Sequence, residues 1–395
     1  MKTLIPLLLL FATFATPLAS QENIPGSFTH QGQSRQYIVH LPPGFSESTL
    51  SPVVMVLHGG SGNMLNVQGF TRMNWVSNQQ GFIAVYPQGI GPTNVAGGYS
   101  WADGRGTTAD ADGIDDVGFL NRLIDTLAVG FGADTSRIYI CGFSNGGFMT
   151  QRLACESPGR FAAVGALGCS MDTALIQNCQ PGVPLPMLYV SGTADPEVPY
   201  EGGTMSNPNV LPVVAVDTAV HFWAAQNGCA LSLPAENLPD LVPDDNSTVE
   251  RVRFTDCDCE AEVQLYRILN GGHTWPGVEL PDLEPLLGET NEDINASSVL
   301  WSFFQPFTNC PALPAAVTAP AATLVKVFPN PTRGPVQIQP HRAVRWARVY
   351  NTAGQLLREH RGATGAISLA DLPNGVYWLQ LALQHEIKVE KLIKQ

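Results

Sequence analysis

Three side chains that together can transfer an acyl group are spread along the chain: Ser144, Asp195 and His273. A serine hydroxyl is a weak nucleophile until a histidine takes its proton, and an acid then stabilises the imidazolium that forms. Each of the three follows an apolar run and stands among small residues. We expect Ser144 to be the nucleophile, His273 the general base and Asp195 its acid partner. The alternatives are a packing histidine for His273 and a simple Asp-Pro turn residue for Asp195.

The stretch around Ser144 has the pattern Gly-x-Ser-x-Gly between Gly142 and Gly146. An apolar run from Arg137 to Cys141 precedes it and helix-compatible sequence follows it. This is the context of a nucleophile elbow, in which a serine projects from a sharp turn between a strand and a helix. The turn is too tight for bulky side chains two residues before and after the serine, which explains both glycines.

An acyl transfer site also needs two backbone donors for the oxyanion. The N–H of Asn145, at the start of the expected helix, is the first candidate. The turn that begins at His58 offers the second, from Gly60 or Ser61. An ordinary glycine-rich turn is the alternative for this second segment.

Four aromatic residues lie in loops near the expected site: Tyr99, Trp101, Tyr200 and Trp275. They are candidates for substrate binding because aromatic rings stack on sugars and other rings. Loop packing with half-buried rings explains them equally well.

Strand-like and helix-like segments alternate through most of the chain, which predicts an α/β fold with a doubly wound, mostly parallel sheet covered on both faces. Asp195 and His273 follow strands, as Ser144 does, so all three belong at the same sheet edge. Their chain order, Ser then Asp then His, is the α/β-hydrolase order. The expected strands are 35–42, 52–57, 82–87, 137–143, 186–192 and 263–269, with a short apolar run at 161–167 and helices from 117, over 216–227 and over 297–307.

Eight cysteines suit an oxidising compartment. A disulfide from Cys229 to Cys257 or Cys259 would close a Pro- and Asp-rich insertion. Cys169 and Cys179 form a second plausible pair, and Cys141 is expected to be a buried thiol.

No metal or cofactor is expected. The pair Cys257 and Cys259 lacks a matching second pair for zinc. The acidic stretch 110–116 places its glycine too early for a calcium-binding EF-hand loop and lacks the bidentate glutamate. We interpret this stretch as a solvated loop in which Asp115 and Asp116 cap the next helix.

The first twenty residues have a basic start, a short apolar core and a small-residue exit, which is typical of a secretory signal peptide. The apolar run is too short to span a bilayer comfortably, so a retained anchor is the less favoured reading, and no later run approaches transmembrane length. The hydrophobic fraction of 44% and the charged fraction of 14% indicate a globular protein. The net charge of −13 argues against nucleic acid as a partner.

The composition changes near residue 310. We expect a signal peptide at 1–20, a catalytic domain at 21–310, a Pro/Ala linker at 311–322 and a small all-β sandwich domain at 323–395. From Thr323 onward ten Lys and Arg stand against four Asp and Glu, a balance of +6, whereas the remainder has eleven against thirty, or −19. Such a charge break marks a separate module.

The region from about 26 to 310 resembles the secreted esterase family that includes polyhydroxybutyrate depolymerase-like enzymes, feruloyl esterases and acetyl xylan esterases. The resemblance implies a carboxylic ester hydrolase with Ser144, Asp195 and His273 as its triad, and an ester substrate that is linked to polysaccharide or polymeric. It does not choose among feruloyl, acetyl and polyhydroxyalkanoate esters. The segments that carry it are 57–60, 115–119, 142–147, 192–195 and 272–277.

The tail from about 321 contains short strand-like segments with turn signals at 327–332, 349–354 and 372–377, and it has a basic ending at 388–394. On these segments the tail resembles the C-terminal sorting domain of type IX secretion. The resemblance implies export through the type IX machinery, leaving the enzyme secreted or attached to the cell surface. A carbohydrate-binding β-module is the alternative.

Two other functions remain open for the whole chain. A prolyl-oligopeptidase-like peptidase shares the triad order but usually has a large additional domain. A non-catalytic surface-binding protein could keep the same fold.

Overall fold

A computed structural model describes residues 22–92, 97–278, 284–310, 326–339, 344–351, 355–361, 365–383 and 387–395. The chain divides into two compact units, Met1–Ala312 and Leu313–Gln395. The expected signal peptide at 1–20 and the expected linker at 311–322 lie outside the described residues, so their structure stays a prediction.

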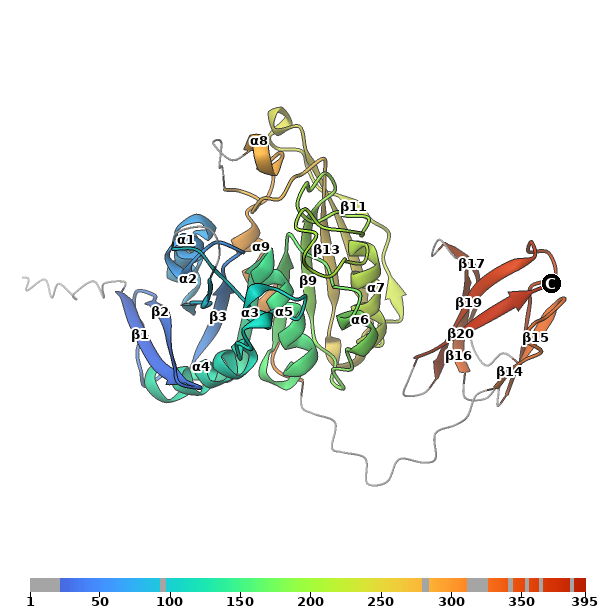
Figure 1. Ribbon diagram of the computed structural model, residues 1–395, viewed down its shortest axis with the longest axis horizontal. Helices are drawn as coiled ribbons and strands as arrows, with labels where there is room; N and C mark the ends of the chain where they lie inside the picture. Colours follow the sequence, from blue (N-terminus) through green and yellow to red (C-terminus); the bar gives the residue numbers. More distant parts are fainter. Residues whose placement is uncertain are drawn as a thin grey trace, which may run out of the picture. The chain divides into compact units, whose positions relative to one another are not determined.

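The N-terminal unit is built on one long mixed sheet, with the strand order β1-β2-β4-β3-β7-β8-β9-β13-β12-β10 and with β11 paired to β12 (Figure 1). The central strands from β4 to β13 are parallel, and the edges are antiparallel. The strands are β1 (Glu22–His30), β2 (Gln33–Leu41), β3 (Ser51–Leu57), β4 (Ile83–Pro87), β7 (Ala133–Phe143), β8 (Ala163–Leu167), β9 (Met187–Gly192), β10 (Leu231–Ser232), β11 (Glu236–Asn237), β12 (Thr248–Thr255) and β13 (Val263–Leu269), and a separate pair is β5 (Gly91–Pro92) with β6 (Tyr99–Ser100).

Helices cover both faces of this sheet because the central strands are apolar on both sides. In β3, Val53 and Met55 face one core and Val54 and Val56 face the other. The first core packs against α4, α5 and α7, and the second against α1, α2 and α9. The helices are α1 (Met64–Thr71), α2 (Met73–Gln80), α3 (Thr108–Ala111), α4 (Asp116–Phe131), α5 (Asn145–Glu156), α6 (Leu175–Asn178), α7 (Val216–Gln226), α8 (Glu284–Leu287) and α9 (Ala296–Phe304).

The predicted α/β fold with a mostly parallel, doubly wound sheet is confirmed. Sequence reasoning missed the antiparallel edges. The expected insertion between Cys229 and Cys257 contains β12, which pairs with β13. Its sequence Thr-Val-Glu-Arg-Val-Arg-Phe-Thr alternates apolar and polar residues, as a strand with one covered face does.

Disulfide bonds in the described part of the chain join Cys155 to Cys179, Cys229 to Cys257 and Cys259 to Cys310. The expected bridge across the insertion is therefore made through Cys257. The pairing of Cys169 with Cys179 was wrong, because Cys169 is a buried free thiol against α5, where a β-carbon on Gly147 would lie 2.6 Å from its Sγ. Cys141 is buried and free, as expected. Burial raises the pKa of both thiols, which keeps them protonated.

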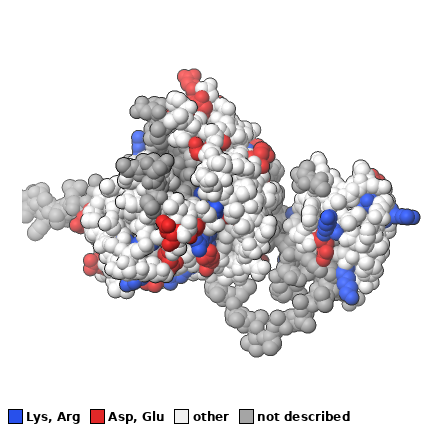
Figure 2. All heavy atoms as spheres, in the orientation of Figure 1, with Lys and Arg blue, Asp and Glu red and all other residues white. Residues whose placement is uncertain are grey.

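The C-terminal unit is a small β-sandwich. One sheet has the order β14-β15-β18 and the other β17-β16-β19-β20. Apolar residues from both sheets, such as Val336, Ala347 and Leu379, share one core. Figure 2 shows Lys and Arg side chains standing out from this unit, in keeping with its positive charge. The strands are β14 (Lys326–Phe328), β15 (Pro335–Gln339), β16 (Val344–Tyr350), β17 (Leu356–Arg361), β18 (Ala366–Ser368), β19 (Gly375–Leu383) and β20 (Ile387–Lys394).

Among the described residues, none of the helices has the length and apolar character needed to cross a membrane.

Candidate active site

Ser144 occupies a sharp turn between β7 and α5. Its backbone has φ 52° and ψ −120°, a conformation that a residue with a side chain rarely adopts. A β-carbon on Gly142 would lie 2.3 Å from the Gly146 carbonyl oxygen, and one on Gly146 would lie 2.5 Å from the carbonyl oxygens of Leu57 and His58. The two glycines are therefore required by close backbone packing, as the elbow interpretation predicts.

Asp195 and His273 come together at the ends of the neighbouring parallel strands β9 and β13. Their loops are in close contact, since a β-carbon on Gly192 would lie 2.2 Å from the Gly271 carbonyl oxygen. His273 Nδ1 lies 2.7 Å from Asp195 Oδ2, and both side chains are almost fully buried. The other carboxylate oxygen of Asp195 accepts the backbone N–H groups of Glu197 and Val198, each at 2.8 Å.

These contacts determine the tautomer of His273. An ionised carboxylate only accepts hydrogen bonds, so Nδ1 carries the proton and donates it to Asp195. Nε2 is then left with a free lone pair, which is the form of imidazole that can accept a proton from a hydroxyl.

The turn after β3 packs directly on the elbow. A β-carbon on Gly59 would lie 3.5 Å from Ser144 Cβ, and one on Gly60 would lie 3.7 Å from Asn145 Cβ. His58 Nδ1 donates to the Gly59 carbonyl at 2.8 Å, and its Nε2 accepts the N–H of Gly89 at 3.0 Å. Burial lowers the pKa of His58 to about 4, so it is neutral at physiological pH. His58 therefore holds the shape of the turn that presents Gly60 and Ser61.

A cavity of about 900 Å³ opens over these residues, and Ser144, His273, Asn145, Gly60 and Ser61 all line it. Two further groups of side chains contribute to its wall. The apolar group is Phe70, Phe143, Met205, Val210, Trp275 and Leu287, and the polar group is Asn66, Ser100, Arg105, Thr107, Thr108, Glu197, Ser206, Asn207 and Thr274. Phe70, Phe143 and Trp275 lie against one another, with ring centroids 5.9–6.3 Å apart.

Of the four aromatic residues expected to bind substrate, Trp275 lines this cavity. Trp101 is fully buried, and its indole N–H donates to the His58 carbonyl at 2.9 Å. Tyr200 is also buried and its hydroxyl accepts a hydrogen bond from Arg267 at 2.7 Å. Tyr99 pairs with Pro92 in the strand pair β5 and β6. Trp101 and Tyr200 are each enclosed by protein and have a structural partner, and the expectation that they bind substrate stays a prediction.

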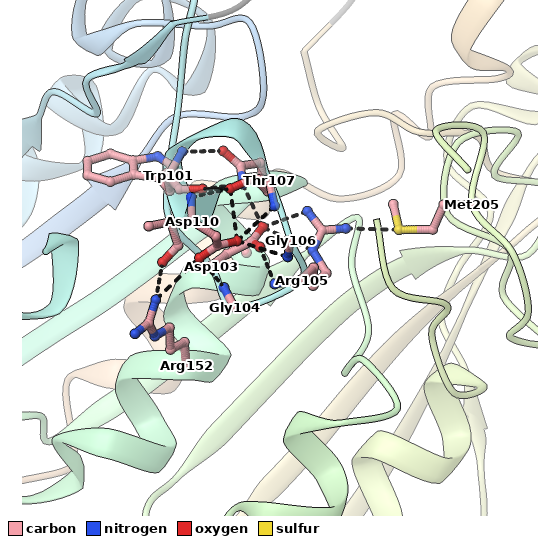
Figure 3. A network of polar contacts seen from close by, with 12 residues as sticks. Trp101, Asp103, Gly104, Arg105, Gly106, Thr107, Asp110, Arg152 and Met205 are labelled. Atoms are coloured by element: carbon pink, nitrogen blue, oxygen red, sulfur yellow. Dashed lines mark hydrogen bonds and ion pairs between the residues drawn. The ribbon is translucent and has the colours of Figure 1, made fainter. Parts of the chain in front are cut away.

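The loop between β6 and α3 contains a polar network that sequence reasoning missed (Figure 3). Asp103 accepts hydrogen bonds from the side chain of Asn145 at 2.6 Å and from Arg105 Nη2 at 2.6 Å. Asn145 Oδ1 in turn accepts the backbone N–H of Trp101 at 2.7 Å. Burial raises the pKa of Asp103, and the charge of Arg105 opposes that shift. The network ties the first residue of α5 to the wall of the cavity.

The two acidic residues at the start of α4 have different roles, and only one is the expected cap. Asp115 accepts the Gly118 N–H at 2.8 Å and caps the helix. Asp116 is fully buried, forms an ion pair with Arg35 and accepts the Ala102 N–H at 2.7 Å. It therefore anchors the loop that carries Asp103 and Arg105.

Among the described residues there is no group of three or more His, Cys, Asp or Glu side chains arranged to hold a metal ion. Asp110, in the stretch weighed for calcium, accepts the N–H groups of Gly104, Gly106 and Thr107 at 2.9–3.0 Å. This carboxylate thus has a structural role in the loop.

Residues 35–174 match the family model described as esterase PHB depolymerase. Feruloyl esterase C of Emericella nidulans is 31% identical over 240 residues, which cover 57% of this chain and 76% of that protein. The chain belongs to the esterase PHB depolymerase family. It is a carboxylic ester hydrolase. The match includes Ser144 but ends before Asp195 and His273, so the roles of those two residues depend on geometry.

Other esterases are also similar to this family member. Feruloyl esterase B of Piromyces equi is 28% identical over 60% of this chain, which spans only 42% of that longer protein. Among solved structures, an acetyl xylan esterase from Aspergillus awamori has a TM-score of 0.45 and 18% identity, covering 64% of this chain and 94% of that one.

Residues 326–395 match the secretion system C-terminal sorting domain. This match agrees with the resemblance seen in the sequence and indicates that the esterase is exported by type IX secretion.

Proposed function

We propose that this esterase works by a serine mechanism with a covalent acyl-enzyme. Ser144 attacks the ester carbonyl, His273 takes the serine proton and gives it to the leaving alcohol, and Asp195 orients the imidazole. A water molecule, whose proton His273 takes, then attacks the acyl-enzyme, and the carboxylic acid leaves Ser144. The observation that carries the proposal is the buried 2.7 Å contact between Asp195 and His273, with His273 and Ser144 on the wall of one cavity.

The oxyanion is assigned to two backbone donors. The N–H of Asn145 lies at the start of α5, where the helix dipole favours negative charge. Gly60 or Ser61 supplies the second donor from the turn that packs on the elbow. The lining of the cavity by all three residues supports this assignment.

The substrate is proposed to be an ester that joins an apolar or aromatic part to a polar part. The cavity supports this class, because its wall combines a cluster of three aromatic rings with a set of hydroxyl and amide side chains. Feruloyl or acetyl esters of plant cell-wall polysaccharides fit this description, and the similarity to feruloyl esterases agrees with it. A polyhydroxyalkanoate is the rival substrate. Hydrolysis of methyl ferulate, acetylated xylan and a polyhydroxybutyrate film, compared in parallel, separates the three.

The serine mechanism is tested by replacing the nucleophile. Ser144→Ala is expected to fold normally and to lose at least about 10⁴-fold in the hydrolysis of 4-nitrophenyl acetate, because the hydroxyl that forms the acyl-enzyme is gone. Ser100→Ala, which removes a different hydroxyl from the cavity wall, is the matched control. A fluorophosphonate probe should label wild-type protein at Ser144 and leave the Ser144→Ala variant unlabelled. Retained activity in that variant would sink the assignment.

The site of action is proposed to be outside the cell. The sorting-domain match, the disulfide bonds and the signal-like N-terminus support export. The esterase would then act as a secreted or surface-attached protein on substrates too large to enter the cell.

A further inference from the structure

Arg105 has a fixed orientation in the wall of the cavity that also holds Ser144. Its Nε and Nη2 both donate to Asp103 Oδ2, at 3.0 and 2.6 Å. Its guanidinium carbon lies 3.5 Å from the centroid of the Phe148 ring. With one edge bound to a carboxylate and one face on an aromatic ring, the guanidinium is preorganised and loses little freedom when it binds anything else.

The remaining nitrogen of Arg105 has only a weak partner. Nη1 contacts the thioether sulfur of Met205 at 2.9 Å (Figure 3). A thioether is a poor hydrogen-bond acceptor, and a methionine side chain changes rotamer easily. Met205 itself lines the cavity, on a segment whose two ends are joined by mutual hydrogen bonds between Gly203 and Val213. An oxygen in the cavity can therefore replace the sulfur at small cost.

The charges around this donor select against an anion. Asp103 is completely buried and already compensates the charge of Arg105. Glu197, a second carboxylate, also lines the cavity. A carboxylate on the substrate would have to enter a site whose formal charge is already negative, whereas a hydroxyl, ether or carbonyl oxygen pays no such cost.

We propose that Arg105 Nη1 donates a hydrogen bond to an uncharged oxygen of the substrate once Met205 turns aside, which makes Arg105 a specificity-determining residue. The inference rests on the proposed esterase function, because it places this donor in the cavity of Ser144. The oxygen belongs either to the acyl group or to the alcohol, and the two sources require separate tests.

The test changes Met205 and leaves the buried pair of Asp103 and Arg105 intact. Met205→Gln places a strong amide acceptor beside Nη1, where it competes with the substrate oxygen. Met205→Leu removes the sulfur, adds no acceptor and serves as the matched control. Two ester pairs report the source of the oxygen. Methyl cinnamate and methyl 4-hydroxycinnamate differ on the acyl side, and ethyl cinnamate and 2-hydroxyethyl cinnamate differ on the alcohol side.

In one of the two pairs, the wild-type enzyme is expected to prefer the hydroxylated ester by about tenfold in kcat/KM, the scale of one hydrogen bond to a charged donor. Met205→Gln should bring that preference close to one, chiefly through KM, and Met205→Leu should not lower it. Dissociation constants measured by calorimetry in the Ser144→Ala background should change in the same ratio, which separates this inference from the serine mechanism. The proposal would be overturned if the wild-type enzyme, Met205→Gln and Met205→Leu showed the same ratio of kcat/KM between hydroxylated and unsubstituted ester in both pairs. Stronger binding of methyl 4-carboxycinnamate than of either neutral ester would also overturn it.

Discussion

Asn145 contributes to the elbow with its side chain as well as its backbone. Its amide donates to Asp103 and accepts from the backbone of Trp101, so the first residue of α5 is held from the side of the cavity. An oxyanion donor must keep its position to within about 0.5 Å. A residue that is also anchored by its side chain moves less than one held by the helix backbone alone. These side-chain hydrogen bonds explain why an asparagine follows Ser144, a position that the Gly-x-Ser-x-Gly pattern leaves open.

His58 predicts a pH dependence of stability. Its pKa falls from an ordinary 6.5 to about 4 on folding because burial disfavours the charged imidazole. The unfolded chain therefore takes up a proton first as the pH falls, and stability is lost between about pH 6.5 and 4, by up to about 3 kcal/mol. The measurement is the free energy of unfolding of wild-type protein and of His58→Asn at pH 7.5 and pH 4.5. Between pH 7.5 and pH 4.5, the free energy of unfolding should decrease less in His58→Asn than in the wild-type protein.

The matched control for this titration is His221→Asn. His221 lies exposed on α7 and its Nδ1 contacts the Asp217 carbonyl. In this control, the free energy of unfolding should differ between pH 7.5 and pH 4.5 by as much as in the wild-type protein. If His58→Asn shows the same difference, the neutral buried imidazole is not the cause of the acid sensitivity.

At the scale of elements, the close approach of α5 to the end of β3 makes Gly146 irreplaceable. An alanine there would place Cβ 2.5 Å from two backbone carbonyl oxygens, neither of which can move without shifting the turn that carries Gly60. We expect Gly146→Ala to lower the free energy of unfolding by at least about 2 kcal/mol and to remove most ester hydrolysis. Thermal unfolding and 4-nitrophenyl acetate hydrolysis measure the two effects.

Gly130 offers the opposite case within the same unit. It lies in α4, and a β-carbon there would meet nothing within 4 Å. Gly130→Ala should therefore stabilise the protein by up to about 1 kcal/mol, as expected when alanine replaces glycine in a helix, and leave hydrolysis unchanged. If Gly146→Ala and Gly130→Ala change stability and hydrolysis equally, the close contacts around Gly146 are not the cause of the losses in Gly146→Ala.

The elements that position the triad could be predicted because their signals are local. The apolar runs at 52–57, 137–143 and 263–269 became β3, β7 and β13 with shifts of a few residues at most. What could not be predicted depends on contacts between distant segments. Asp116 has the sequence context of a helix cap, and only its approach to Arg35 and Ala102 turns it into an anchor. Likewise, the pairing of Cys155 with Cys179 requires the end of α5 to lie beside the end of α6.

The network around Arg105 marks the clearest limit of sequence reasoning. The segment 101–107 shows glycines and alternating charges, which are typical of any solvated loop. Its residues Asp103 and Arg105 are instead buried beside the cavity, where they compensate each other's charge. The sequence around Asp103 and Arg105 does not indicate that the two side chains are buried. They are covered by residues that are distant in the chain, namely those of α5 and of the segment around Met205.

At the scale of the whole molecule, we expect the two units to be separable in function. They have separate cores, and the charge balance changes from −19 to +6 between the parts of the chain before and after Thr323. The disulfide from Cys259 to Cys310 closes the catalytic unit just before the change in composition. The folding information of the esterase is therefore expected to lie before residue 311, and the information for sorting across the outer membrane after it.

A chain that ends at Cys310 tests this division, and it also tests the domain boundary predicted from composition. Its hydrolysis of 4-nitrophenyl acetate should stay within about twofold of the full chain, because the core of the catalytic unit and its disulfides remain intact. In a cell with a type IX system, the shortened protein should accumulate inside the outer membrane, whereas the full chain reaches the medium or the cell surface. Fractionation followed by an activity assay measures both. Loss of activity in the purified shortened protein would contradict the boundary, and undiminished export would contradict the sorting role, so the two claims can fail independently.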